Sequence, residues 1–281
     1  MGLKERQKKY FKIELEVLFY SLLGMCIIGK IQNSWSLKDI ASGCLPVISG
    51  KYWYITSYLL LLVFSKYINM VPEKLKKDDF EKLLLLMFTV FSVIPTFLYF
   101  HIMNDGGKGF ANMLMMYFIG RYIRIYCDGK GISTKSVVIM GVLSIGIGLV
   151  LNGILSLLRG EGVYAPFARD CSSTIVLGSI SIFMIFKKIN IKSKWINGLA
   201  KHVLAIYLFE GAVRMVLNCF FDITSYVGKW YLYLVIIVYV MVVMVVCTVV
   251  DLVRAALAPP VENIIYSGAQ NMYNLVMTKF K

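Results

Sequence analysis

Eight apolar stretches, separated by short polar loops, run through nearly the whole chain. A helix needs roughly 20 apolar residues to cross the hydrocarbon core of a bilayer, with a range of about 17–25, and most stretches approach that length. Because backbone polar groups in lipid must be satisfied within their own segment, each stretch predicts a helix. We therefore predict an all-α, polytopic membrane bundle of about eight transmembrane helices. The stretches are Leu15–Gly29, Tyr52–Ile68, Leu83–Phe100, Phe110–Ile125, Val137–Leu158, Ser173–Phe186, Leu199–Phe220 and Trp230–Val250.

The positive charge alternates between successive loops, and this alternation predicts the orientation of the bundle. Of the 30 Lys and Arg residues, 22 lie in the N-terminal segment, in alternate loops and in the C-terminal segment, and 8 lie in the remaining loops. Cytoplasmic loops of membrane proteins carry the excess of Lys and Arg. We therefore expect both termini in the cytoplasm. Membrane orientation accounts for the net charge of +14, so we expect no nucleic-acid partner.

The composition excludes an ordinary soluble domain of this size, because 58% of the residues are hydrophobic and the mean hydropathy is +0.71. We expect one transmembrane domain over residues 1–281 and a short interfacial helix within Leu37–Ile48. Pro259 and Pro260 are expected to end the last spanning helix. The segment of about 259–281 would then form an amphipathic tail on the inner membrane face.

Ionisable side chains inside apolar stretches mark functional sites by default. In the seventh stretch, Tyr207, Glu210 and Arg214 fall on one helical face at positions i, i+3 and i+7. Glu210 precedes Arg214 by four residues, which is the favourable order for an intrahelical ion pair. Two interpretations stay open here: an ion pair near the outer interface that neutralises itself and orients the helix, or the polar wall of a substrate cleft. Because the two residues lie well inside the apolar stretch, we expect the pair to be buried.

A second polar stripe lies in the fourth stretch, where Tyr117, Arg121 and Arg124 share a face at i, i+4 and i+7. The two arginines lie near the inner end of the stretch. They fit membrane anchors whose charged ends reach water. The alternative is a site for the phosphates of a cytosolic donor, because the planar guanidinium group matches phosphate geometry.

The consecutive aromatic residues Tyr52, Trp53 and Tyr54 open the second stretch, where aromatic belts commonly form. The chain has only two histidines, His101 and His202, and neither has a carboxylate or a nucleophile beside it in sequence. No cluster has the spacing of metal ligands, so we expect no metal.

Several segments together resemble the acyltransferase-3 family of multi-pass membrane O-acyltransferases, and in particular members that modify bacterial surface polysaccharides. The likeness runs roughly from Lys8 to Arg254. The matching segments are Lys9–Lys12 through Val17–Ser21, Gly50–Tyr58, Met115–Arg124 and Ala205–Glu210.

The resemblance implies transfer of an acyl group, with acetyl as the expected group, from cytosolic acyl-CoA to a sugar hydroxyl. The acceptor would be a polysaccharide or lipid-linked glycan on the far side of a bacterial cell membrane, and membrane lipid would surround the chain. By position, Arg121 and Arg124 would bind the phosphates of the donor. Tyr52, Trp53, Tyr54 and Arg214 would bind the sugar, and Tyr207 and Glu210 would be the catalytic residues.

The sequence departs from the family pattern in two places. An early family span that carries a histidine, preceded by an arginine, has no counterpart, as if the first two spans were missing. Glu210 stands where related sequences often have histidine. With Glu210 as the only buried base in view, we expect little or no acyl transfer by this chain alone. A transporter or flippase of lipid-linked sugars and a non-catalytic membrane scaffold stay open as alternatives.

Overall fold

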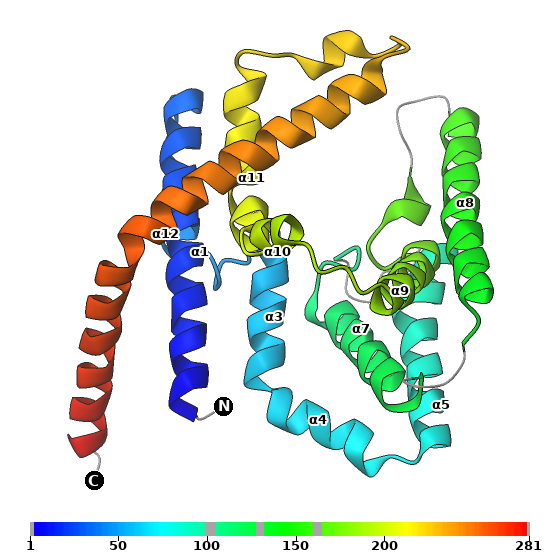
Figure 1. Cartoon of the computed structure of the whole chain (residues 1–281), viewed down its shortest axis with the longest axis horizontal. Coiled ribbons are helices and arrows are strands. Elements are labelled where there is room, and N and C mark those ends of the chain that lie inside the picture. Colours follow the sequence, from blue (N-terminus) through cyan, green and yellow to red (C-terminus); the bar gives the residue numbers. More distant parts are fainter. Residues whose placement is uncertain (1–2, 99–104, 128–131, 160–164, 280–281) are drawn as a thin grey trace. The chain divides into compact units, whose positions relative to one another are not determined.

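The computed structural model describes residues 3–98, 105–127, 132–159 and 165–279, with side chains described between residues 10 and 268 of these ranges (Figure 1). The described residues are helical and include no strand, which confirms the predicted all-α class. Each of the eight apolar stretches lies mainly in helices. His101 falls outside the described residues.

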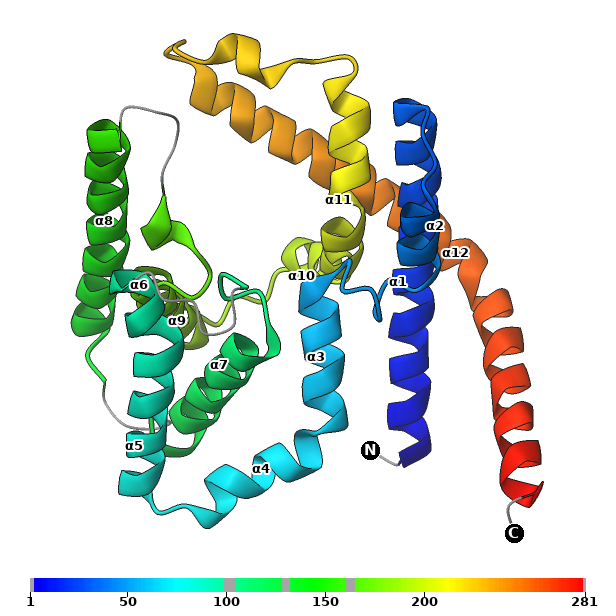
Figure 2. The ribbon, with the colours of Figure 1, turned by 180° about the vertical axis from the view of Figure 1, so that it is seen from behind.

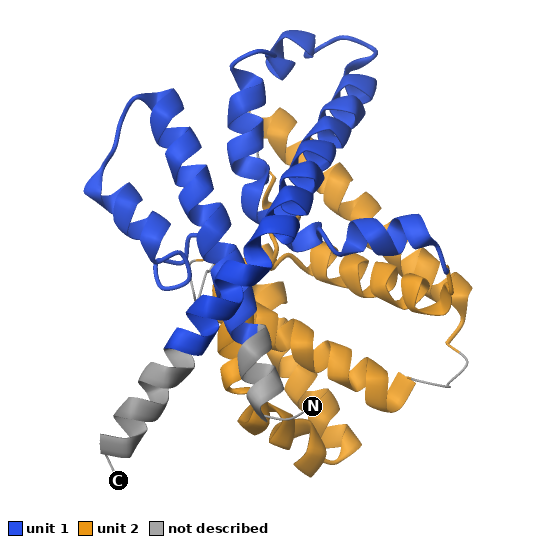
Figure 3. Cartoon of the chain, turned by 60° about the vertical axis from the view of Figure 1, so that its left-hand side comes forward, with its two compact units in different colours: residues 1–52, 192–281 blue, residues 53–191 orange. Residues whose placement is uncertain are grey.

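The chain divides into two compact units (Figure 3). The first unit comprises residues 1–52 and 192–281, and the second comprises residues 53–191. The elements of the first unit are α1 (Leu3–Gln32), α2 (Leu37–Cys44), α10 (Lys194–Ala200), α11 (Val203–Asn218), η4 (Ile223–Tyr226) and α12 (Leu232–Lys279). Those of the second unit are α3 (Trp53–Val63), α4 (Ser65–Lys74), α5 (Lys77–Phe88), η1 (Thr89–Val93), α6 (Ile94–Phe97), α7 (Phe110–Tyr122), η2 (Ile123–Cys127), α8 (Thr134–Arg159), η3 (Pro166–Ala168) and α9 (Ser173–Lys188).

In the first unit, α11 packs against both α1 and α12. Small residues allow the close approach of α1 and α11, since a Cβ atom on Gly24 would lie 3.7 Å from the Cβ atom of Ala212. The short helix α2 lies alongside α1 (Figure 2) and confirms the helix predicted within Leu37–Ile48. Ser36 caps its N-terminus by accepting a hydrogen bond from the amide of Asp39.

The prediction that Pro259 and Pro260 end the last spanning helix is wrong, because α12 continues through both prolines to Lys279. Each proline lacks the N–H that would bond to the carbonyl four residues earlier, so the helix loses two hydrogen bonds there. An ion pair of 3.2 Å between Arg254 and Glu262 joins the turns on either side of the prolines and helps the helix to continue. Figure 1 shows α12 changing direction in this region without a break in the ribbon.

The second unit has a small hydrophobic core and a tightly packed helix pair. The core is formed by Phe80, Met87, Met115, Phe118 and Val176. Helices α8 and α9 meet through glycine and hydroxyl residues, as membrane helices commonly do. A Cβ atom on Gly141 would lie only 2.9 Å from the Cβ atom of Ser181, and one on Gly148 would lie 3.2 Å from that of Thr174.

Four helical segments in the described part of the chain are long and apolar enough to cross a membrane: 77–97, 134–159, 166–188 and 232–268. Helices α3 and α4 would make a fifth span, but they bend by 66° at Phe64, so Tyr52–Ile68 is not one straight helix. The stretch Leu199–Phe220 is likewise divided, between α10 and α11. The predicted count of eight spans is not confirmed, and the cytoplasmic location of both termini stays a prediction.

Candidate functional site

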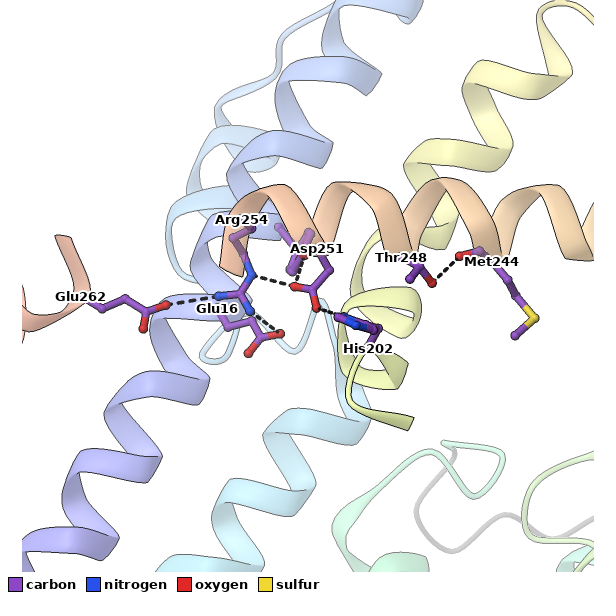
Figure 4. A network of polar contacts seen from close by, with 8 residues as sticks. Glu16, His202, Met244, Thr248, Asp251, Arg254 and Glu262 are labelled. Carbon is purple, nitrogen blue, oxygen red and sulfur yellow. Dashed lines mark hydrogen bonds and ion pairs between the residues drawn. The ribbon is translucent and has the colours of Figure 1, made fainter. Parts of the chain in front are cut away.

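A buried network of polar side chains joins α1, α11 and α12 in the first unit (Figure 4). Asp251 of α12 lies at its centre with only 3% of the residue exposed. A buried carboxylate is costly unless it is hydrogen-bonded and paired with positive charge. Asp251 meets both conditions through His202, Tyr20 and Arg254.

His202 and Asp251 form a close pair in which the histidine Nδ1 atom lies 2.6 Å from Asp251 Oδ2. His202 directly precedes the first residue of α11, and 14% of its side chain is exposed. A hydrogen bond to a carboxylate requires the proton on Nδ1, and a neutral imidazole in this tautomer has the lone pair of Nε2 available to accept a proton. Within the described residues, no hydrogen bond to Nε2 is found. This is the arrangement of a histidine general base oriented by a carboxylate.

Arg254 holds Asp251 in place and connects it to two further carboxylates. Its Nε atom donates to Asp251 Oδ1 over 2.8 Å, while Nη2 and Nη1 lie 3.2 Å from Glu16 and Glu262, respectively. Only 8% of the arginine side chain is exposed. Tyr20, which is fully buried, donates its hydroxyl to Asp251 Oδ1 over 2.6 Å, and its ring lies under the guanidinium group. Three donors thus restrict the Asp251 carboxylate to one orientation.

The predicted catalytic residues Tyr207 and Glu210 lie in α11 of the same unit. The Tyr207 ring packs 6.1 Å from the ring of Tyr52, whose hydroxyl donates to the carbonyl oxygen of Leu208 over 2.9 Å. The ion pair of Glu210 with Arg214 exists, but its charged atoms are 4.0 Å apart. The interpretation of a buried pair is wrong, because 47% of the Glu210 side chain and 57% of the Arg214 side chain are exposed. Glu210 is also not the only buried base, since His202 and Asp251 are more deeply buried.

This exposure predicts a weak interaction between Glu210 and Arg214. We expect Glu210→Ala and Arg214→Ala each to change the free energy of unfolding by no more than about 0.5 kcal/mol, with a coupling energy of similar size or smaller. A double-mutant cycle on the detergent-solubilised protein measures that coupling. A coupling energy above about 2 kcal/mol would contradict the exposed geometry and restore the buried-pair interpretation.

Of the two predicted donor-binding arginines, Arg121 and Arg124, only Arg121 is partly buried. Its side chain is 24% exposed, and Nη2 lies 4.0 Å from Glu73 in a loose ion pair. Its Nε atom is buried and has no hydrogen-bond partner among the described residues. Arg124 lies in the π-helical turn η2 and is exposed. Arg121 therefore has an unsatisfied buried donor, and Arg124 adds positive charge to the same segment.

The predicted sugar-binding aromatics are divided between the two units. Tyr52 belongs to the first unit, whereas Trp53 and Tyr54 begin α3 in the second, where their rings meet edge to face at 5.9 Å. Arg214 lies in the first unit. The structure therefore places Tyr52 beside Tyr207, and it places Trp53 and Tyr54 in an aromatic pocket of the second unit.

The sequence interpretation missed the network around Asp251. His202 and Asp251 are 49 residues apart, and Tyr20 and Asp251 are 231 residues apart, so no local spacing connects them. Two signals were nevertheless present. Glu16 lies inside the first apolar stretch, and Asp251 follows directly on the last stretch, three residues before Arg254. Ionisable groups at these positions need partners, and they indicate a polar site.

The fold and this network define a class: a helical membrane protein with a partly buried histidine that is oriented by a buried carboxylate. The chain belongs to the acyltransferase-3 family, because the family model described as an acyltransferase domain matches residues 7–250. The protein is thus a membrane acyltransferase in general terms. No curated protein and no solved structure was found to match the chain.

Proposed function

We propose that this protein transfers an acetyl group from acetyl-CoA to a hydroxyl of a cell-surface polysaccharide or lipid-linked glycan in a bacterial cell membrane. Membership of the acyltransferase-3 family supports the reaction type. The single observation that carries the proposal is the 2.6 Å contact between His202 and Asp251. Transfer to a hydroxyl needs a general base, and a histidine oriented by a carboxylate has the arrangement of one.

In this mechanism the sugar hydroxyl oxygen attacks the carbonyl carbon of the thioester while His202 Nε2 takes the hydroxyl proton. Asp251 accepts the hydrogen bond from Nδ1 and stabilises the imidazolium that forms. The carbon–sulfur bond then breaks, and the CoA thiolate recovers the proton from Nε2 to leave as the thiol. The products are the sugar ester and free CoA, and the histidine returns to its starting form.

Arg121 and Arg124 are the proposed phosphate-binding residues for the donor. The buried Nε atom of Arg121 lacks a partner among the described residues, and charge-assisted contacts with phosphate would satisfy it. The loose 4.0 Å pair with Glu73 can open without the loss of a short hydrogen bond. The proposed acyl transfer uses no metal, because side chains supply both the base for the transfer and the positive charge for donor binding.

The test uses membranes from cells that express the chain, radiolabelled acetyl-CoA and the host's surface glycan. We expect label in the glycan that alkaline hydrolysis releases, as it does for an O-acetyl ester. Transport of a lipid-linked sugar that needs no acyl-CoA, with no label transferred, would contradict the proposal and favour a flippase. Absence of both activities would favour a non-catalytic scaffold.

Donor binding gives a separate prediction. Arg121→Gln should raise the KM for acetyl-CoA by about tenfold to a hundredfold, because a charge-assisted contact is typically worth about 1.5–3 kcal/mol. Acetyl-dephospho-CoA, which lacks one phosphate of the donor, distinguishes that phosphate from the rest of the molecule. Arg121→Lys should recover part of the loss, since lysine keeps the charge but not the planar fork. An unchanged KM in Arg121→Gln would show that this arginine is a membrane anchor only.

A further inference from the structure

A pocket of about 530 Å³ lies between α3 and α7 in the second unit. This volume is within the usual range for small-molecule sites. Helix α3 contributes Trp53, Tyr54 and Tyr58, and α7 contributes Asn112 and Tyr117. The remaining wall is aliphatic or thioether, from Leu61, Leu62, Met113 and Met116.

The aromatic side of the pocket is built from rings in two orientations. Tyr54 and Tyr58, one helical turn apart, have rings that are nearly parallel, with an angle of 4° and centroids 6.4 Å apart. Trp53 stands perpendicular to Tyr54. The face of an aromatic ring is electron-rich and attracts weakly positive hydrogen atoms. The C–H groups on one face of a pyranose ring are a matching surface.

Asn112 supplies the polar side of the pocket. Its Nδ2 atom donates to the carbonyl oxygen of Gly107 over 2.9 Å, which fixes the plane of the amide. Its Oδ1 atom is buried and has no hydrogen-bond partner among the described residues. Buried polar atoms almost always have a partner, so this acceptor points to a ligand that brings a donor. A purely apolar lipid tail would leave the acceptor unsatisfied, whereas a sugar hydroxyl would not.

We infer that this pocket binds a sugar ring of the glycan acceptor, with Trp53, Tyr54 and Tyr58 against its C–H face and Asn112 Oδ1 accepting from a ring hydroxyl. The inference rests on the proposed function and deepens it by assigning a binding role to Asn112 and Tyr58. A sugar combines an apolar face with hydroxyl donors, and the pocket offers both complements.

The experiment measures sugar binding without any acyl donor. The purified full chain is placed in lipid nanodiscs, which avoids glycoside detergents, and saturation-transfer NMR is recorded with methyl β-glucopyranoside, methyl β-galactopyranoside and N-acetylglucosamine in turn. We expect saturation of the ring C–H protons for at least one sugar. Trp53→Ala should weaken binding at least tenfold. The matched control is Trp195→Ala, because Trp195 is 85% exposed and lies in the other unit.

Two substitutions of Asn112 distinguish the role of its acceptor atom Oδ1 from the role of its hydrogen bond to the carbonyl oxygen of Gly107. Asn112→Leu and Asn112→Asp both lose the donor to Gly107, but only the aspartate keeps an oxygen acceptor. We expect binding to be about two- to tenfold weaker in Asn112→Leu and largely kept in Asn112→Asp. Equal loss in both variants, with unchanged thermal unfolding, would assign Asn112 to loop structure and overturn its role.

The outcomes also distinguish this inference from the proposed function. Sugar binding that depends on Trp53, in a protein that transfers no acetyl group, would support the pocket and contradict the transferase. Glycan acetylation that persists in Trp53→Ala and Asn112→Leu, with no saturation of any sugar, would leave the transferase in place and overturn the pocket.

Discussion

Replacing His202 with glutamine should lower the rate of acetyl transfer by about 10²–10⁴, which is the usual contribution of general acid–base catalysis. Glutamine can still donate a hydrogen bond to Asp251, so the network and the fold should be kept. Its amide has no basic nitrogen, however, so it cannot take the hydroxyl proton. The loss should appear in kcat, with the KM for acetyl-CoA nearly unchanged, because His202 has no proposed contact with the donor's phosphates.

The same assay on Glu210→Gln decides between the two candidate bases. The expectation of little or no transfer had two reasons: the early family span with its histidine has no counterpart in this sequence, and Glu210 was the only buried base in view. The pair of His202 and Asp251 removes the second reason, while the first stays untested. Transfer that survives His202→Gln but is abolished by Glu210→Gln would make Glu210 the base and refute the proposed mechanism. Asp251→Asn should resemble His202→Gln, because an asparagine no longer stabilises the imidazolium.

Removing the Arg254 guanidinium should cause a large loss of stability in the first unit. Arg254→Ala would leave Asp251, Glu16 and Glu262 close together without their shared positive partner. Breaking a buried ion pair by removing one partner typically costs about 3–5 kcal/mol, because the remaining charge is uncompensated. We expect a reduction of that size in the free energy of unfolding, measured by denaturant titration in detergent.

Three variants define the origin of that loss. Arg254→Lys should lose part of the stability, since one ammonium group cannot reach three carboxylates with the fixed geometry of a guanidinium group. Adding Asp251→Asn to Arg254→Ala should cost less than the sum of the single changes, because it removes one of the stranded charges. Arg214→Ala, at an exposed arginine, is the control and should stay within about 0.5 kcal/mol. A loss in Arg254→Ala no larger than in this control would show that the network contributes no stability.

The sequence by itself determined the class of the protein and the position of its helices. Runs of apolar residues such as Val137–Leu158 have only one way to satisfy their backbone in lipid, so their helical structure follows from local composition. The family was also readable from ordered local segments such as Met115–Arg124, and the family model confirms it. A hydrogen-bonded cap is equally local, as at Ser36 before α2.

Only the tertiary structure decided where the helices break and which polar groups meet. Pro259 and Pro260 predict a helix end by local rules, but α12 continues through them. The ion pair of Arg254 with Glu262 and the packing of α12 stabilise the helix on both sides of the prolines. The exposure of Glu210 depends on which face of α11 the neighbouring helices cover, and the helical period alone does not predict that face. Tyr20 and Asp251 come from α1 and α12, and His202 directly precedes α11, so their contact is set by the packing of these three helices. Their separation in sequence is large, so the candidate base became visible only once the chain was folded.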